Sequence, residues 1–384
     1  MCKEFGKWIF ILLIIAILLS GCRSDMKEIQ NLNYATAIGV DYKDDKYFIY
    51  IQLIGLTSVA RTEGEAGSPQ TFVSTAEGET FIDAFFEVYQ TGQEMFIWSH
   101  ITSIVLSESV LNEGIGNVFD GLTRYYEFRL TPWVFGTKEP IDKVLSTQGF
   151  FDQSVLETTL HNPESTHRQS SIIRPIKLQE LARDIYEPAM TTYIPYLSIS
   201  EEEWINNMEP ESKLKLEGAF FLSGDTYKGS YSLEELNGLR WIAPETKRAA
   251  ILVPGKKRPD FLAVIDQLNV DIALKDPSQK SFTATFNLDG QIGNQINGNN
   301  KLFNMKKDTS ESIQKEIRDL YLLGVQDQVD FFNLEHLLYR NHNTLWKQSR
   351  EKLVLDETAL EDIEVKVNLY HTGAFKNKIV EEAD

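Results

Sequence analysis

The chain has 384 residues, of which 42% are hydrophobic and 11% aromatic, and its formal net charge is −18 at pH 7. This apolar content is that of a folded protein and excludes a disordered chain, while the length favours two or three domains over one core. The negative charge disfavours binding to nucleic acid or to anionic lipid headgroups.

The first residues have the pattern of a bacterial export signal. Lys3 and Lys7 precede twelve apolar residues that run from Trp8 to Leu19. An apolar run of this length is typical of a signal peptide, because a helix that spans a bilayer needs about 20 such residues. We therefore expect residues 1–21 to be a signal peptide that is removed during export.

The apolar run ends in a sequence that resembles a lipobox, Leu19-Ser20-Gly21-Cys22. In this pattern Leu19, Ser20 and Gly21 are the residues that the signal peptidase recognises, and the Cys22 thiol accepts the lipid. The sequence therefore predicts a lipid anchor on Cys22; the alternative is an uncleaved N-terminal anchor with an incidental cysteine. The only other cysteine, Cys2, lies in the removed segment, so no disulfide and no cysteine-based metal site is expected in the mature chain.

Residues 22–33 are predicted to be a lipidated N-terminus and linker, and residues 34–200 an α+β region of one or two domains. In this region β-rich segments mix irregularly with apolar stripes at spacings of three and four. Residues 61–70 have the composition of an exposed loop. The predicted strands are 34–40, 47–56, 101–106, 131–136 and 193–199. The predicted helices are 80–90, 109–114, 115–126, 140–145 and 177–186.

A polar, acidic run predicts a domain linker over residues 201–212, followed by a C-terminal α+β domain over residues 213–376 and a tail over residues 377–384. Ser232 and Glu235 have the spacing of a capping box, which predicts a helix to about residue 241. The other predicted elements of this domain are strands at 214–222, 226–229, 249–253, 263–273, 281–288 and 363–370, a loop at 291–300 and a long helix at 310–340. The irregular order of helices and strands predicts the α+β class, with mixed sheets, packed helices and two to three domains.

Several segments in fixed order resemble the Ger(x)C family, the C subunits of bacterial spore germinant receptors. Behind the lipobox, Glu28-Ile29 and the sequence Ala-Ile-Gly-Val-Asp at 37–41 are similar to the opening of family members, as is the block from residue 81 to 136. The family usually has a Trp-Asp pair after the cysteine, where this chain has Arg23-Ser24-Asp25. Later similarities are the strand–turn–strand at 217–229, the helix at 236–241, residues 328–330, Trp346 and residues 364–373.

The resemblance implies an α+β protein without enzymatic activity and without a cofactor. It implies a position on the outer face of the spore inner membrane, held by the N-terminal lipid. The implied partners are an integral-membrane A subunit and a transporter-like B subunit, with which the protein would act in nutrient-triggered germination. The sequence identifies no ligand-binding residue, and it leaves open whether this subunit contacts the nutrient.

Common enzyme motifs are absent from the sequence: it has no Gly-x-Ser-x-Gly, no phosphate-binding glycine loop and no His-Glu-x-x-His. His161 and His167 are six residues apart, which predicts a solvated loop rather than a metal site. His336 and His342 have the same spacing and do not share a helix face. His100 is expected to be buried and hydrogen-bonded. No catalytic or metal-binding residue is therefore predicted.

Several charged residues are expected to have structural rather than functional roles. Glu201-Glu202-Glu203 is expected to be a solvated linker, Arg124 and Arg129 to form ion pairs, and Asp330 to be a helix-breaking cap. Two other functions remain open at this point. A solute-binding lipoprotein that delivers a small molecule to a membrane transporter would usually have two α/β lobes in which strands and helices alternate regularly. This chain lacks that regular alternation. A cell-wall hydrolase would need paired carboxylates in a cleft, which nothing in the sequence singles out.

Overall fold

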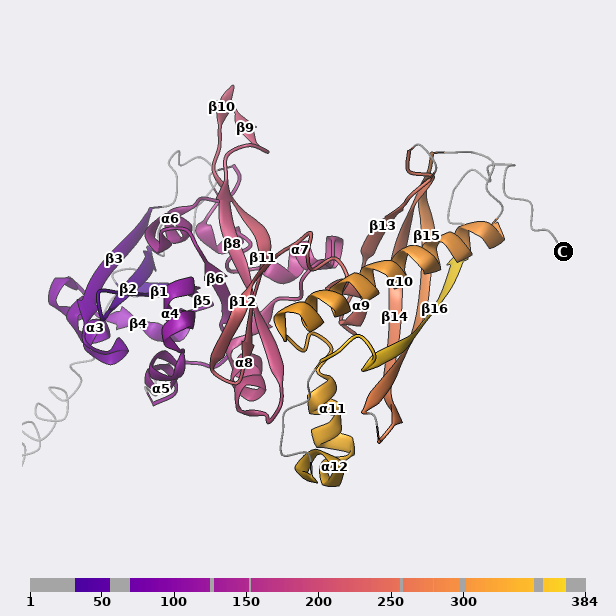
Figure 1. Cartoon of the computed structure of the whole chain (residues 1–384). Helices are drawn as coiled ribbons and strands as arrows, with labels where there is room; N and C mark the ends of the chain where they lie inside the picture. The colour runs from indigo at the N-terminus through magenta and orange to yellow at the C-terminus, as the bar shows by residue number, and fades with distance from the viewer. Residues whose placement is uncertain are drawn as a thin grey trace, which may run out of the picture.

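The computed structural model describes residues 32–55, 70–124, 128–151, 153–255, 258–278, 280–296, 302–348 and 355–370. They form two large β-sheets that lie side by side, each with its own helices, and a separate two-stranded sheet (Figure 1). The predicted α+β class, with mixed sheets and packed helices, is confirmed. The predicted signal peptide, Cys22, nearly all of the loop at 61–70 and the C-terminal tail lie outside the described residues.

The first sheet has ten strands in the order β12-β11-β8-β6-β5-β1-β2-β3, with β4 beside β1 and β7 beside β6. Four of them, β1, β5, β6 and β8, are mutually parallel neighbours, so their carboxyl ends lie along one edge. The strands are β1 (Asn33–Lys43), β2 (Lys46–Ile54), β3 (Thr71–Gly78), β4 (Phe96–Ile97), β5 (Ser103–Ser107), β6 (Trp133–Thr137), β7 (Ile176–Lys177), β8 (Thr191–Ser200), β11 (Lys213–Ser223) and β12 (Thr226–Ser232).

Helices cover both faces of this sheet, which explains why β1 is buried, and β2 apolar, at nearly every position. On one face Ile38 and Ile49 pack with α3, α4, α5 and α8; on the other Ala37 and Val105 pack with α6. A Cβ at Gly39 would clash with Ile141 of α6, so only glycine allows this close approach. The helices are α3 (Phe81–Glu87), α4 (Glu108–Glu113), α5 (Gly116–Arg124), α6 (Ile141–Ser146), α7 (Pro163–Gln169) and α8 (Leu178–Tyr186), with 3-10 turns η2 (Val88–Thr91), η3 (Trp98–His100) and η4 (Val155–Glu157).

The predicted linker at 201–212 does not separate two domains. It connects β8 to β11, and these strands pair along their whole length, from Ser200 opposite Lys213 to Thr191 opposite Ser223. The connection itself forms a small hairpin of β9 (Ile205–Asn206) and β10 (Glu209–Pro210) that projects from the sheet (Figure 1). Strands β11 and β12 therefore complete the first sheet, and the change to the second sheet comes after residue 232.

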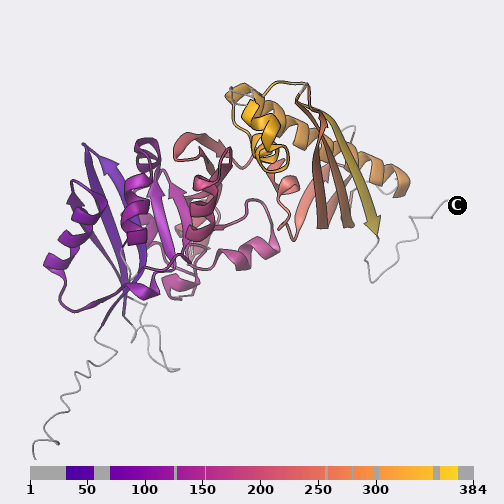
Figure 2. The same cartoon turned by 90° about the horizontal axis from the view of Figure 1, so that it is seen from below.

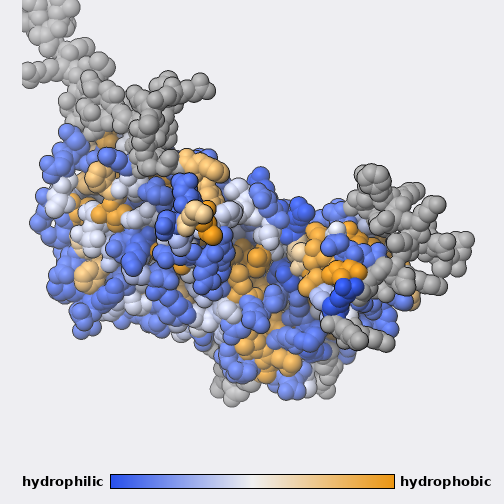
Figure 3. All heavy atoms as spheres, turned by 90° about the horizontal axis from the view of Figure 1, so that it is seen from above, coloured by the Kyte–Doolittle hydropathy of each residue, from blue (hydrophilic) through white to orange (hydrophobic). Residues whose placement is uncertain are grey.

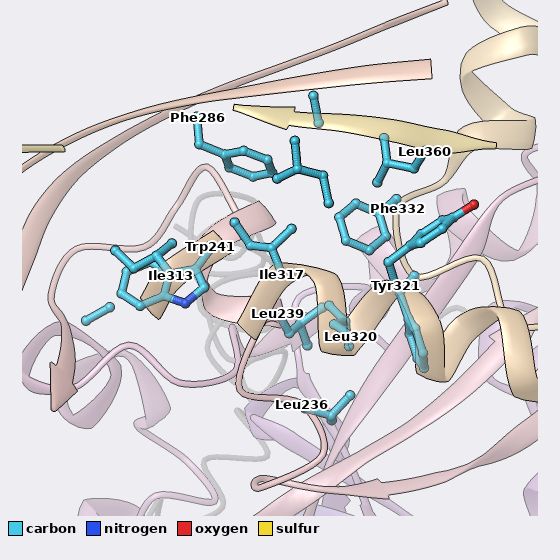
Figure 4. Packing of buried hydrophobic residues seen from close by; sticks show 14 of the residues in the cluster. Leu236, Leu239, Trp241, Phe286, Ile313, Ile317, Leu320, Tyr321, Phe332 and Leu360 are labelled. Carbon is cyan, nitrogen blue, oxygen red and sulfur yellow. The ribbon is translucent and has the colours of Figure 1, made fainter. Parts of the chain in front are cut away.

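The second sheet has four strands in the order β13-β14-β15-β16, of which only β15 and β16 are parallel. The long helix α10 runs across one face of this sheet (Figure 2). Trp241, Phe286, Ile313 and Ile317 meet in the core between them (Figure 4). The elements are β13 (Ala249–Val253), β14 (Phe261–Asp276), β15 (Ser281–Gln295), β16 (Leu360–Tyr370), α9 (Leu239–Ile242), α10 (Leu302–Asp327), α11 (Leu334–Asn341) and α12 (Asn343–Gln348).

The single helix predicted over 310–340 is wrong. Helix α10 ends at Asp327, and Gln328 (φ 54°) and Asn333 (φ 55°) have left-handed backbones that interrupt it. A carboxylate oxygen of Asp330 accepts the Glu335 backbone N–H at 2.9 Å in the first turn of α11, but the N-cap residue of this helix is Asn333, so the prediction of a cap at Asp330 itself is wrong. The predicted capping box at residues 232–235 forms, but turns follow it and α9 begins only at residue 239.

Aromatic contacts join the two sheets. The ring of Phe331, which follows α10, lies 4.7 Å from that of Phe221 and 5.2 Å from that of Tyr231, both in the first sheet. The Thr191 backbone N–H also donates to the Asn333 side chain at 2.7 Å. The segment that follows α10, with Phe331 and Asn333, is therefore packed against the first sheet.

Candidate functional site

The histidine pair at 161 and 167 does not flank a solvated loop, so this prediction is wrong. Helix α7 begins after His161 and contains His167, and His161 is buried with its Nδ1 2.6 Å from the hydroxyl of Thr102. Burial lowers the pKa of His161 to about 3, which keeps the ring neutral. Burial also lowers the pKa of His167. Among the described residues, no group of three or more potential metal ligands comes together.

Other residues that the sequence singled out lie at the surface. His100 is exposed rather than buried, and its ring meets the edge of Tyr34 at 5.1 Å. Arg124 pairs with Asp120 at 2.6 Å, as expected of an exposed helix pair. In the segment predicted as a helix at 80–90, Phe86 is exposed, and the buried side chains are Phe81, Ala84, Phe85 and Val88.

A pocket of about 1180 Å³ opens beside the carboxyl end of β8. It lies between α6, the segment 147–151 and the β9–β10 hairpin. We call residues 147–151 and 201–213 together the tip.

The buried ammonium of Lys213 holds the two parts of the tip together. Its Nζ donates to the backbone carbonyls of Gln148 (3.2 Å) and Gly149 (2.9 Å) and to the carboxylate of Glu211. It also lies 4.8 Å from the ring centre of Phe150. Hydrogen bonds from a charged donor are stronger than neutral ones, so Lys213 fixes the segment 147–151 against the start of β11.

Large apolar side chains project from the tip into solvent. Phe151 and Met208 are each 92% exposed, Ile205 is 74% exposed and Trp204 is 51% exposed. The Trp204 ring packs edge-on against Phe150 at 4.6 Å. A space-filling view onto this end of the molecule shows apolar spheres bordered by hydrophilic ones where the hairpin projects (Figure 3).

Acidic side chains surround this apolar cluster. Residues 201–213 contain five glutamates against one lysine. Glu203 accepts from the Ser200 hydroxyl and pairs with Lys215 at 2.9 Å, and these two contacts lower the pKa of its carboxyl group. The sequence interpretation missed the tip because a polar, acidic composition is typical of linkers. The available signal was the apolar residues Trp204, Ile205 and Met208 inside that acidic run.

Comparison with known proteins assigns a family to both parts of the chain. Residues 25–199 match the family described as "Spore germination protein N-terminal domain", and residues 217–373 match "Spore germination B3/ GerAC like, C-terminal". The chain belongs to the Ger(x)C family of spore germination proteins. The hairpin lies between the two matched segments, so family membership assigns it no role.

Individual relatives are distant in sequence. The chain is 25% identical over 248 residues to YfkR of Bacillus subtilis (strain 168), whose name assigns it provisionally to spore germination; the match covers 63% of this chain and 62% of YfkR. It is 23% identical to "Spore germination protein KC" of the same organism, with 96% of each chain covered. The solved structure described as "Crystal Structure of the GerBC protein" covers 90% of this chain and 100% of its own, at 14% identity and a TM-score of 0.49. No helix of the described residues is long and apolar enough to cross a membrane.

Proposed function

We propose that this Ger(x)C protein is the lipid-anchored C subunit of a spore germinant receptor. It acts with integral-membrane A and B subunits in nutrient-triggered germination, on the outer face of the spore inner membrane. The observation that carries the proposal is the lipobox-like sequence ending at Cys22, directly ahead of the first family match at residue 25. A lipid on Cys22 raises the effective concentration of the protein beside membrane partners, so weak contacts suffice.

The proposed role is one of contact rather than catalysis. The contact between His161 and the Thr102 hydroxyl is buried, and the lowered pKa of His161 makes its ring a weak base, while His100 lies on the surface. The tip, by contrast, presents a shaped surface with exposed apolar side chains.

A solute-binding lipoprotein is the second candidate, and the pocket beside Lys213 is the observation that favours it. The second sheet does not support this alternative, since it is largely antiparallel and carries one long helix instead of a second α/β lobe. A thermal-shift screen of the purified protein against amino acids and sugars separates the two. A Tm rise of several degrees with one small solute would favour solute binding.

The direct test of the proposal is Cys22→Ala in the spore, with Cys2→Ala as the matched control. Cys22→Ala is expected to leave the fold intact, to remove the protein from the inner membrane and to slow nutrient-triggered germination. Cys2→Ala is expected to change neither, because Cys2 lies in the predicted signal peptide. Normal germination of Cys22→Ala spores that have no membrane-bound protein would contradict the proposal.

A further inference from the structure

We infer that the tip is a docking surface for a protein partner that presents an apolar socket bordered by lysines and arginines. This inference goes beyond the proposed receptor role, because it stands on the geometry of the tip whether or not the partner is a receptor subunit. Its evidence is the exposed apolar cluster, the backbone that holds it and the surrounding charge.

The apolar side chains form a cluster rather than a scatter. Single exposed hydrophobic residues are normal on protein surfaces, but Trp204, Ile205 and Met208 lie within five consecutive residues, and Phe150 joins Trp204 to Phe151. Aromatic residues and methionine are enriched at the centres of protein interfaces. The cluster therefore has the composition of an interface core that lacks its partner.

The backbone holds two of these side chains outward at a cost in conformational energy. Met208 (φ 74°) and Phe151 (φ 54°) both have left-handed conformations, which favour glycine or asparagine over large side chains. Asn207 (φ 50°) and Met208 form the two-residue connection between β9 and β10, where Asn-Gly is the preferred pair. Large apolar residues at such positions indicate a function outside the fold, since folding alone gains nothing from them.

The tip is also prepared for binding. Lys213 fixes segment 147–151 to the start of β11, so Phe150 and Phe151 do not have to be ordered when a partner arrives. Rigid apolar anchors of this kind lose little conformational entropy on binding and commonly carry most of the affinity of an interface.

Charge decides between a protein and a bilayer as the occupant. Residues 201–213 carry five glutamates and one lysine, and Lys215 beside them pairs with Glu203, so the tip keeps a net negative charge. Anionic lipid headgroups would repel this charge, whereas a socket bordered by basic side chains complements it. A protein is therefore the occupant that fits.

The test places a photo-cross-linking benzoylphenylalanine at Phe151 in the full-length lipoprotein in spore inner membranes. Phe303 on α10, which is 77% exposed, is the matched control position. The expected result is one discrete protein adduct from position 151 and none from position 303, with the cross-linked partner peptide containing apolar residues next to Lys or Arg. Met208→Gly in the same chain, and separately Glu202→Lys with Glu209→Lys, are each expected to lower the adduct yield at least tenfold.

Any of four results would overturn the inference: adducts only with lipid, equal adducts from both positions, no adduct, or a partner site without basic residues. Glycine fits the left-handed backbone at 208, so an unchanged circular dichroism spectrum will show that this variant is folded. The Cys22→Ala experiment is independent of the tip. If it slows germination while position 151 gives no adduct, the docking inference fails and the proposed function stands.

Discussion

Replacing Lys213 with methionine removes the ammonium that joins the two parts of the tip but keeps an unbranched side chain of similar length. The variant loses hydrogen bonds to the Gln148 and Gly149 carbonyls and the contact with the Glu211 carboxylate. A hydrogen bond from a charged group is worth about 1.5–3 kcal/mol, and the contacts of one side chain do not add fully. The retained packing on Phe150 offsets part of the loss, so we expect the tip to be destabilised by about 2–4 kcal/mol.

Hydrogen–deuterium exchange is the appropriate assay, because a global melting curve of a chain with two sheets does not resolve a local loss of stability. A loss of about 2–4 kcal/mol corresponds to exchange that is roughly 30 to 700 times faster in peptides covering residues 143–156 and 205–216. Peptides from the second sheet, such as residues 282–290, should not change.

Lys215→Met is the matched control for this prediction. Lys215 is also on β11, but its ion pair with Glu203 has side chains that are 45% exposed on both sides. Exposed pairs contribute about 0–1 kcal/mol, so this variant should change exchange by no more than about fivefold. Equal effects of the two substitutions, or no effect of Lys213→Met, would refute the claim that Lys213 fixes the tip.

Three further predictions concern stability. Burial raises the pKa of Asp330 to about 6, so the folded state holds this proton more tightly than the unfolded chain, whose value is near 3.8. Stability from this group is therefore largest below pH 4 and falls by about 3 kcal/mol as the pH rises through 6. In urea titrations at pH 4–7, Asp330→Asn should show a flatter dependence of the unfolding free energy on pH than the unsubstituted protein. Parallel pH dependences of the two proteins would argue against this assignment. Glu316→Ala should lower the free energy of unfolding in urea by about 3 kcal/mol, because both carboxylate oxygens of Glu316 accept from Arg240 at 2.9 Å and one accepts from the Trp241 ring N–H at 2.6 Å. A loss below about 1 kcal/mol would mean that this network does not stabilise the fold. Met208→Gly should slow exchange in peptide 205–216 by up to about fivefold while weakening binding, and faster exchange would show that the left-handed backbone is not strained.

Sequence patterns predicted the parts of the fold that packing periodicity determines. The segments 47–56 and 177–186 were predicted to be a strand and a helix, and they form β2 and α8. Strand β3 was missed because it lies at the edge of the sheet, where its residues need not be apolar. The break after α10 was hidden because the left-handed residues there, Gln328 and Asn333, are not glycines.

Only part of the candidate site could likewise be predicted from the sequence. A lipobox is a local pattern, so Cys22 could be predicted from sequence, and it remains a prediction because it lies outside the described residues. The tip could not be predicted, because it depends on a long-range contact. Phe150 and Trp204 are 54 positions apart in the sequence and meet only because the segment after α6 and the end of β8 lie at one edge of the sheet.

The measurement that tests the proposed function most directly is affinity purification of the tagged protein from detergent-solubilised spore inner membrane, followed by mass spectrometry. The Cys22→Ala chain, tagged in the same way, is the control for binding that does not require the anchor. We predict recovery of two integral-membrane proteins, one of them transporter-like, with the intact chain and their loss with Cys22→Ala. Recovery of neither, or of an ABC-type permease in their place, would contradict the receptor-subunit proposal.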